Sequence, residues 1–171
     1  MNRERKTQTV FVQVVEKPRR KLLLKRGKEA TEYFQYCEEV GCEVWEVLKR
    51  VEDALFEPAG YWLPEVLRTP GTSRYVQGVE VPLDFQGKRP EGYTLLTLPQ
   101  GTFMVFQGEP FEEEDFGAAI EGLREHIASF DPTLYGFHYE EDTAPSFQLE
   151  PQGQRGYIEA RPVSALKDHK K

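Results

Sequence analysis

The sequence is poor in the residue types that covalent stabilisation and metal binding require. Its 171 residues include only two cysteines, three histidines and two methionines. Cys37 and Cys42 lie five apart on one predicted helical segment, and no histidine stands beside them at metal-ligand spacing. We therefore expect two reduced, buried thiols, with neither a disulfide framework nor a metal site.

Long apolar runs are missing too. No stretch approaches the ~20 apolar residues that a membrane-spanning helix needs. Residues 1–6 are charged and have no apolar stretch of a secretory signal behind them. We expect a globular, cytoplasmic protein without a membrane partner. The length suits one domain, or two small ones that share a core.

Sequence signatures of catalysis are also lacking. No serine lies in a nucleophile elbow, and the histidines are isolated from one another. The glycines form no phosphate-cradling loop and no dinucleotide-binding fingerprint. We therefore expect no cofactor, and we favour a binding role over catalysis.

Charge is distributed unevenly, although the formal net charge is only −7. Residues 1–28 hold ten Lys and Arg against two acids, a balance of +8, while the rest holds twelve against twenty-seven, a balance of −15. The early bases flank the apolar run Leu22–Leu24, which indicates a strand with basic ends rather than a nucleic-acid arm. Because the acidic remainder repels phosphate, we expect no direct contact with nucleic acid.

The hydrophobic pattern predicts an α+β fold with two long helices. The first helix covers 30–55, with a kink at Gly41 left open, and the second covers 112–130. The segment 58–71 is rich in proline and glycine and is predicted to be an aromatic loop. Strands are predicted at 9–16, 21–25, 74–83, 93–98, 102–107, 134–140, 147–150 and 155–163, with 93–107 forming a hairpin.

Two strand segments are near-repeats of each other. Gly78–Leu83 and Tyr157–Val163 each carry one carboxylate among apolar residues, Glu80 and Glu159, and each contains a proline near its end. A strand-like segment and a helical segment precede both. This predicts two comparable halves, about 9–84 and 92–165, with tails at 1–8 and 166–171 and a cleft between the halves.

The order of these segments resembles a known family. The segments that carry the resemblance are Gly78–Pro82, Leu95–Phe106 with its Pro99-Gln100-Gly101 turn, the helix from Phe116, Leu134–Phe137, Pro145–Glu150 and Ile158–Val163. Together they resemble the GyrI-like effector-binding domains, which also form the C-terminal ligand-sensing half of many AraC-type transcription regulators and occur in MerR-type multidrug-responsive regulators. The resemblance covers roughly residues 9–165.

The resemblance implies a fold and a kind of ligand. It implies a pseudo-twofold tandem of β-α-β-β units, with antiparallel sheets flanking a central ligand groove and two long helices outside. Family members bind drug-like or lipophilic cationic molecules through aromatic walls and buried acids. Where the family commonly has Phe-Glu-x-Tyr, this chain has Phe147-Gln148-Leu149-Glu150, so Gln148 replaces the usual glutamate and Glu150 the usual tyrosine.

Candidate ligand-binding residues follow from this reasoning. A buried carboxylate without a partner is costly, so it can select a cation, and aromatic faces add cation–π attraction. Glu80 is alternatively a solvent-facing residue, and Glu159 alternatively pairs with Arg161, while about half of the aromatic residues are expected to be core. The candidates are Trp45, Tyr61, Trp62, Tyr75, Glu80, Tyr135, Phe137, Gln148, Glu150, Tyr157 and Glu159.

The predicted function is a ligand-sensing module of a bacterial AraC-type transcription regulator, which binds a small lipophilic compound, either neutral or cationic. Since the chain has no helix-turn-helix pair, it would reach DNA only through a separate DNA-binding domain. A homodimer is left open. The alternatives are a standalone hydrolase of cyclopropane-type electrophiles that uses the groove carboxylates, a drug-sequestering protein, and an inhibitory partner of a topoisomerase.

Overall fold

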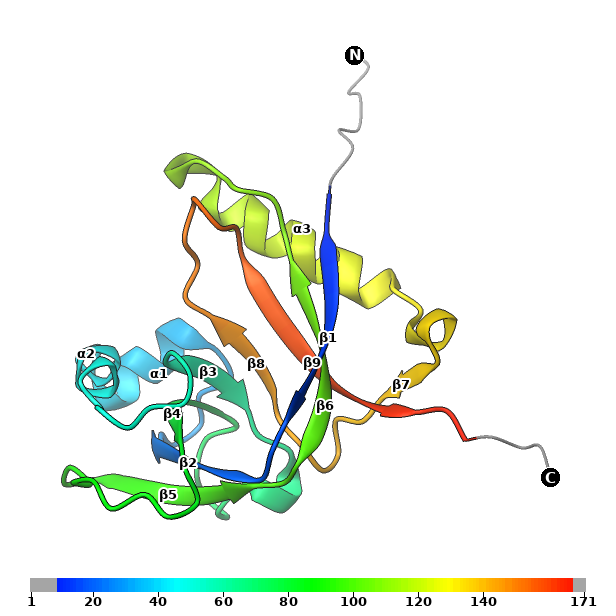
Figure 1. The fold of residues 1–171 in the computed structure, drawn as a ribbon. Helices are drawn as coiled ribbons and strands as arrows, with labels where there is room; N and C mark the ends of the chain where they lie inside the picture. The colour runs from blue at the N-terminus through cyan, green and yellow to red at the C-terminus, as the bar shows by residue number, and fades with distance from the viewer. Residues whose placement is uncertain (1–8, 168–171) are drawn as a thin grey trace.

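The computed structural model describes residues 9–167, and these form an α+β fold with one nine-stranded antiparallel sheet and three α-helices (Figure 1). The predicted fold class is confirmed at this level. The strands are β1 (Phe11–Lys17), β2 (Arg20–Lys25), β3 (Ala59–Trp62), β4 (Tyr75–Val81), β5 (Tyr93–Leu98), β6 (Gly101–Gln107), β7 (Phe137–Tyr139), β8 (Ser146–Leu149) and β9 (Ile158–Ala165). The helices are α1 (Tyr33–Val40), α2 (Val44–Lys49) and α3 (Phe116–Ser129), with 3₁₀ turns at Glu65–Leu67, Glu113–Asp115 and Pro132–Tyr135. None of the described helices is both long enough and apolar enough to cross a membrane.

The strand order is β1-β6-β9-β8-β3-β4-β2-β5, with β7 paired to β9. The two strands predicted as a hairpin exist, but the hairpin prediction is wrong: β5 pairs with β2, and β6 pairs with β1 and β9. Lys17 lies opposite Gly101 and Arg20 opposite Leu98, so β1–β2 and β5–β6 run alongside each other as one long ribbon. The chain continues past Pro99 instead of folding back there. This ribbon joins the two ends of the sheet.

The first predicted helix is broken in two. Gly41 ends α1 with a φ of 95°, in the region that favours glycine, and its N–H donates to the Cys37 carbonyl at 2.8 Å. Two short helices, α1 and α2, therefore replace the continuous helix predicted over 30–55, and the prediction of two long helices is wrong for this half. The break also leaves Cys42 exposed and Cys37 only partly buried, so the expectation of two buried thiols is wrong.

The segment predicted as an aromatic loop contains the central strand β3, which lies between β4 and β8. Its four residues, Ala59–Trp62, are too few to show a period, and prolines stand close on both sides. A β-carbon on Gly60 would overlap the hydroxyl of Tyr75, so glycine allows that ring to cross the strand. The predicted strand over 134–140 is likewise shorter, because a 3₁₀ turn precedes β7.

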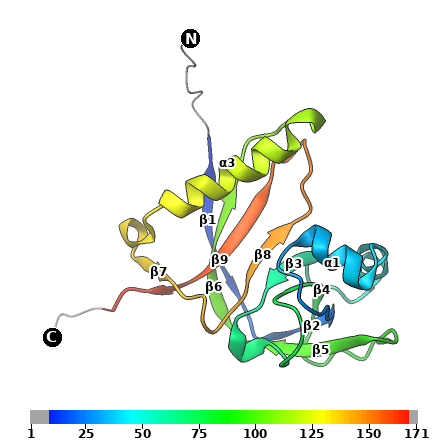
Figure 2. The same cartoon turned by 180° about the vertical axis from the view of Figure 1, so that it is seen from behind.

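The two faces of the sheet carry different side chains. Because side chains alternate along a strand, the registers of β3 with β8 put Tyr61 and Phe147 on one face and Trp62 and Gln148 on the other. Helix α1 covers the Trp62 face through the contact of Tyr36 with Tyr75, and α3 lies on that same side of the sheet (Figure 2). The largest buried cluster includes Leu22–Leu24, Tyr61, Phe103 and Phe147, and a smaller one lies under α3.

Candidate functional site

A polar and aromatic cluster lies on the face of the sheet that carries α1 and α3. We call it the Glu159 cluster. It brings together side chains from β3, β4, β8, α3 and the start of β9: Trp62, Tyr75, Arg124, Gln148, Tyr157 and Glu159. Five of these six residues are among those predicted from the sequence, and the registers of β3, β8 and β9 place them side by side.

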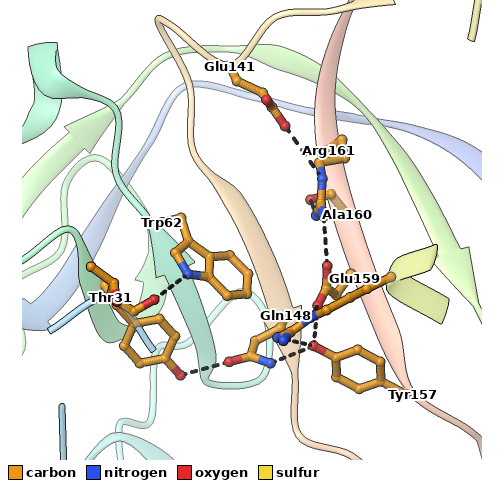
Figure 3. Close-up of polar contacts among 10 residues, drawn as sticks. Thr31, Trp62, Glu141, Gln148, Tyr157, Glu159, Ala160 and Arg161 are labelled. Carbon is orange, nitrogen blue, oxygen red and sulfur yellow. Dashed lines mark hydrogen bonds and ion pairs between the residues drawn. The ribbon is translucent and has the colours of Figure 1, made fainter. Parts of the chain in front are cut away.

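Hydrogen bonds run through the cluster from β4 to β9 (Figure 3). The Tyr75 hydroxyl donates to Gln148 Oε1 at 2.9 Å, and Gln148 Nε2 donates to the Tyr157 hydroxyl at 2.6 Å. The Tyr157 hydroxyl in turn donates to Glu159 Oε2. Gln148 therefore accepts from one tyrosine and donates to the next, which an ionised glutamate could not do because it has no donor.

Glu159 is the buried charge of the cluster, with a side chain only 1% exposed. Its Oε2 lies 2.6 Å from Arg124 Nε, and its Oε1 lies 2.9 Å from Arg161 Nη2. The predicted alternative, that Arg161 pairs with Glu159, is confirmed. Arg161 also lies 3.4 Å from the Glu141 carboxylate, so the four charged groups form a neutral set (Figure 3). The buried carboxylate is thus compensated within the chain.

Two aromatic rings border the guanidinium of Arg124. The Trp62 indole N–H donates to the Thr31 carbonyl at 3.0 Å, and the indole packs edge-on against Tyr75 with ring centroids 5.6 Å apart. The Arg124 guanidinium carbon lies 5.7 Å from the centre of the Trp62 ring and 5.9 Å from that of Tyr157. A cation therefore sits beside two aromatic faces and a carboxylate, which is an arrangement that attracts positive charge.

Burial keeps the tyrosines of the cluster protonated. Burial raises the pKa of Tyr157 well above its ordinary value, and the negative charge of Glu159 raises it further. Burial also raises the pKa of Tyr75. Both phenol groups therefore stay neutral and able to donate hydrogen bonds across the physiological pH range. For Arg124, burial disfavours the charge, but Tyr157 and Glu159 outweigh it, so its pKa is raised.

Glu80 lies in a different cluster, on the opposite face of the sheet together with Tyr61. Its carboxylate is 3.1 Å from both Lys17 Nζ and Arg20 Nε, and it accepts from the Tyr61 hydroxyl at 2.9 Å. Arg20 also donates to the carbonyls of Pro18 and Pro99, where the ribbon bends. Glu80 is 2% exposed, so the alternative of a solvent-facing glutamate is wrong. Its assignment as a ligand-binding residue stays a prediction.

The remaining predicted residues are not in contact with the Glu159 cluster through any hydrogen bond or ring contact of residues 9–167. Trp45 lies on α2, and Phe137 lies on β7 against the core under α3. Tyr135 is 55% exposed and its ring packs on Phe130. Glu150 follows the last residue of β8, where its carbonyl accepts from Arg155. Their roles in ligand binding stay predictions.

Sequence reasoning missed Arg124. It stands on α3 next to the buried Leu123, among exposed charged residues, and no motif distinguishes it. Its partner Glu159 is 35 residues away in the chain, so only the placement of α3 over β9 reveals the pair.

A cavity of about 800 Å³ opens beside α3 and adjoins the cluster at Tyr157. Its apolar lining includes Val10, Phe111 and Leu123. Several acids of the 109–115 segment also line it: Glu109, Glu112, Glu113 and Asp115. The volume lies within the range of small-molecule sites, roughly 300 to 1,000 Å³. Within residues 9–167, no group of three or more histidine, cysteine or acidic side chains is arranged to hold a metal ion.

Comparison with solved structures identifies the fold. SAV2435 bound to tetraphenylphosphonium matches with a TM-score of 0.53 and 16% sequence identity, over 90% of this chain and 94% of that one. A protein from Staphylococcus aureus MU50 assigned to bacterial transcription regulation matches with a TM-score of 0.54 and 16% identity, over 91% and 99% of the two chains. No protein-family model and no curated protein sequence matches the chain. The resemblance to GyrI-like effector-binding domains is confirmed at the level of the fold.

Proposed function

We propose that this chain is a small-molecule sensing module that binds a lipophilic cation at the Glu159 cluster. The observation that carries the proposal is a carboxylate, 1% exposed, that holds a guanidinium lying beside the rings of Trp62 and Tyr157. Burial makes such a carboxylate depend on a positive partner, and the aromatic rings favour a polarisable, weakly hydrated one.

Two further observations support this choice of ligand. SAV2435, a protein of the same fold, is bound to tetraphenylphosphonium, which is a lipophilic cation. The cavity next to Tyr157 combines apolar lining with several acids, a composition that suits a large apolar ion.

We also propose that the domain is built from two related units within residues 9–84 and 92–165: β2-α1-α2-β3-β4, and β6-α3-β8-β9 with the short strand β7 inserted after α3. In each unit the last strand lies between the other two, in the orders β2-β4-β3 and β6-β9-β8. The shared order supports a pseudo-twofold relation. The Glu159 cluster then lies where β3 of one unit meets β8 of the other.

The biological setting we propose is that of a bacterial, cytoplasmic transcription regulator of the AraC type, for which this chain would be the multidrug-responsive effector-binding domain. The neighbour assigned to bacterial transcription regulation supports the regulatory setting. A separate DNA-binding domain would contact the operator. Light scattering of the purified chain tests whether it forms a homodimer.

Isothermal titration of the chain with tetraphenylphosphonium tests the proposed function. We expect saturable one-site binding, weakened about tenfold or more by Glu159→Gln, because the amide removes the buried negative charge of the cluster that attracts the cation. Glu57→Gln is the matched control, since it removes a partly exposed carboxylate that pairs with Arg155 elsewhere. Absence of saturable binding to the wild-type chain, or equal binding by Glu159→Gln, would contradict the proposal.

A further inference from the structure

Arg124 occupies the position that a bound cation would take. Its Nε lies 2.6 Å from Glu159 Oε2, its Nη2 donates to the Tyr157 hydroxyl at 3.2 Å, and its guanidinium lies beside the Trp62 ring. These three groups are the ones that the proposed function assigns to the ligand. The chain thus supplies its own cation to this site.

The groups around Arg124 are held by other contacts. The Trp62 indole N–H donates a hydrogen bond to the Thr31 carbonyl, and its ring packs on Tyr75. The Tyr157 hydroxyl accepts a hydrogen bond from Gln148. The Arg124 side chain is 45% exposed, whereas that of Glu159 is 1% exposed. Long charged side chains readily extend into water at modest cost. Arg124 is therefore the member of the cluster that can leave while the rest stays in place.

The charge balance makes this departure necessary. Glu159 is paired with Arg124 on one oxygen and Arg161 on the other, and Arg161 is itself paired with Glu141. Although Glu159 Oε1 makes no hydrogen bond, each carboxylate oxygen has a guanidinium nitrogen within 2.9 Å, so a second cation entering this neutral set would meet the repulsion of both arginines. Of the two arginines paired with Glu159, Arg161 is the less free to move, because its side chain is only 19% exposed and its guanidinium pairs with both Glu141 and Glu159.

We propose that Arg124 is an intramolecular competitor that fills the cation position of the Glu159 cluster, sets the affinity threshold of the site and must swing out for a ligand to bind. The inference rests on the proposed function. Only a cation that gains enough from Trp62, Tyr157 and the adjoining cavity displaces the guanidinium, so small hydrated cations are excluded. Because Arg124 links α3 to Glu159 on β9 and to Trp62 on β3, its release also removes these two links when ligand enters.

Truncation of Arg124 tests this inference. In Arg124→Ala the competing cation is gone, so tetraphenylphosphonium should bind with a Kd about tenfold lower than in wild type. This is expected if the binding-competent state, in which Arg124 has left the cluster, is a minor population in wild type and the whole population in the variant. Lys49→Ala is the matched control: it also removes a positive side chain that is 45% exposed on a helix and paired with a glutamate. Its Kd should equal that of wild type.

Chemical rescue separates the inference from the proposed function. Methylguanidinium should raise the Tm of Arg124→Ala relative to equimolar sodium chloride, because it refills the vacated position, and it should leave wild type and Lys49→Ala unchanged. Rescue without any tetraphenylphosphonium binding would support the Arg124 position and overturn the proposed function. Saturable binding that Arg124→Ala leaves equal or weaker would overturn the inference alone. If Arg124→Ala does not fold, Arg124→Gln, which keeps a donor near Glu159, replaces it in both measurements.

Discussion

Replacing Glu80 by glutamine should destabilise the protein far more than replacing an acid in an exposed pair. The side chains of Glu80 and Arg20 are 3% and 1% exposed, so Glu80→Gln leaves a guanidinium buried without its counter-ion. Removing one partner of a buried ion pair typically costs 3 to 5 kcal/mol. Lys17 is 13% exposed and can turn towards water, and the glutamine oxygen still accepts from Tyr61. We therefore expect the lower end, about 3 kcal/mol.

The free energy of unfolding in urea, measured by circular dichroism, gives this cost directly. Glu57→Gln is the control, because the Glu57–Arg155 pair has side chains 33% and 27% exposed and should be worth less than about 1 kcal/mol. Adding Arg20→Met to Glu80→Gln removes the stranded charge and should recover part of the loss. A difference between Glu80→Gln and Glu57→Gln below about 0.5 kcal/mol would refute the burial argument, since exposed pairs differ by that much among themselves.

Two further predictions concern pH and the packing of β3. Burial raises the pKa of Glu80, but Lys17, Arg20 and Tyr61 outweigh it and hold that pKa below its ordinary value. The unfolded chain therefore binds the proton more readily than the folded chain, so the free energy of unfolding falls as the pH drops below about 4.3 and through the lower folded pKa. Urea titrations at several pH values should show a smaller fall in the free energy of unfolding for Glu80→Gln than for wild type. Gly60→Ala should cost about 2 kcal/mol because its β-carbon overlaps the Tyr75 ring. Gly117→Ala on α3 is the control: its β-carbon would meet no atom within 4 Å, so the substitution should stabilise the protein by about 0.5 kcal/mol. Equal changes in the free energy of unfolding for the two variants would contradict the close approach at Gly60.

Local patterns in the sequence were enough for most of the elements. Alternating apolar residues located the strands around Val79 and Ile158, and the three- and four-residue spacing of Phe116, Ile120, Leu123 and Ile127 located α3. These patterns work because each element must bury one face, whichever element covers it. Short segments escaped the same reasoning: Ala59–Trp62 has too few residues to show a period, although β3 lies in the middle of the sheet.

What the sequence determined by itself was therefore the list of elements, the acids among apolar residues and the aromatic candidates, because these depend on neighbours along the chain. Only the tertiary structure decided which partners each acid has. Glu80 meets Arg20 across 60 residues, and Glu159 meets Arg124 across 35. Both carboxylates look alike in sequence, yet one is enclosed by the bend of the ribbon and the other lies beside an exposed arginine and two rings. The difference arises from strand pairing and helix placement, which are long-range contacts that no local pattern encodes.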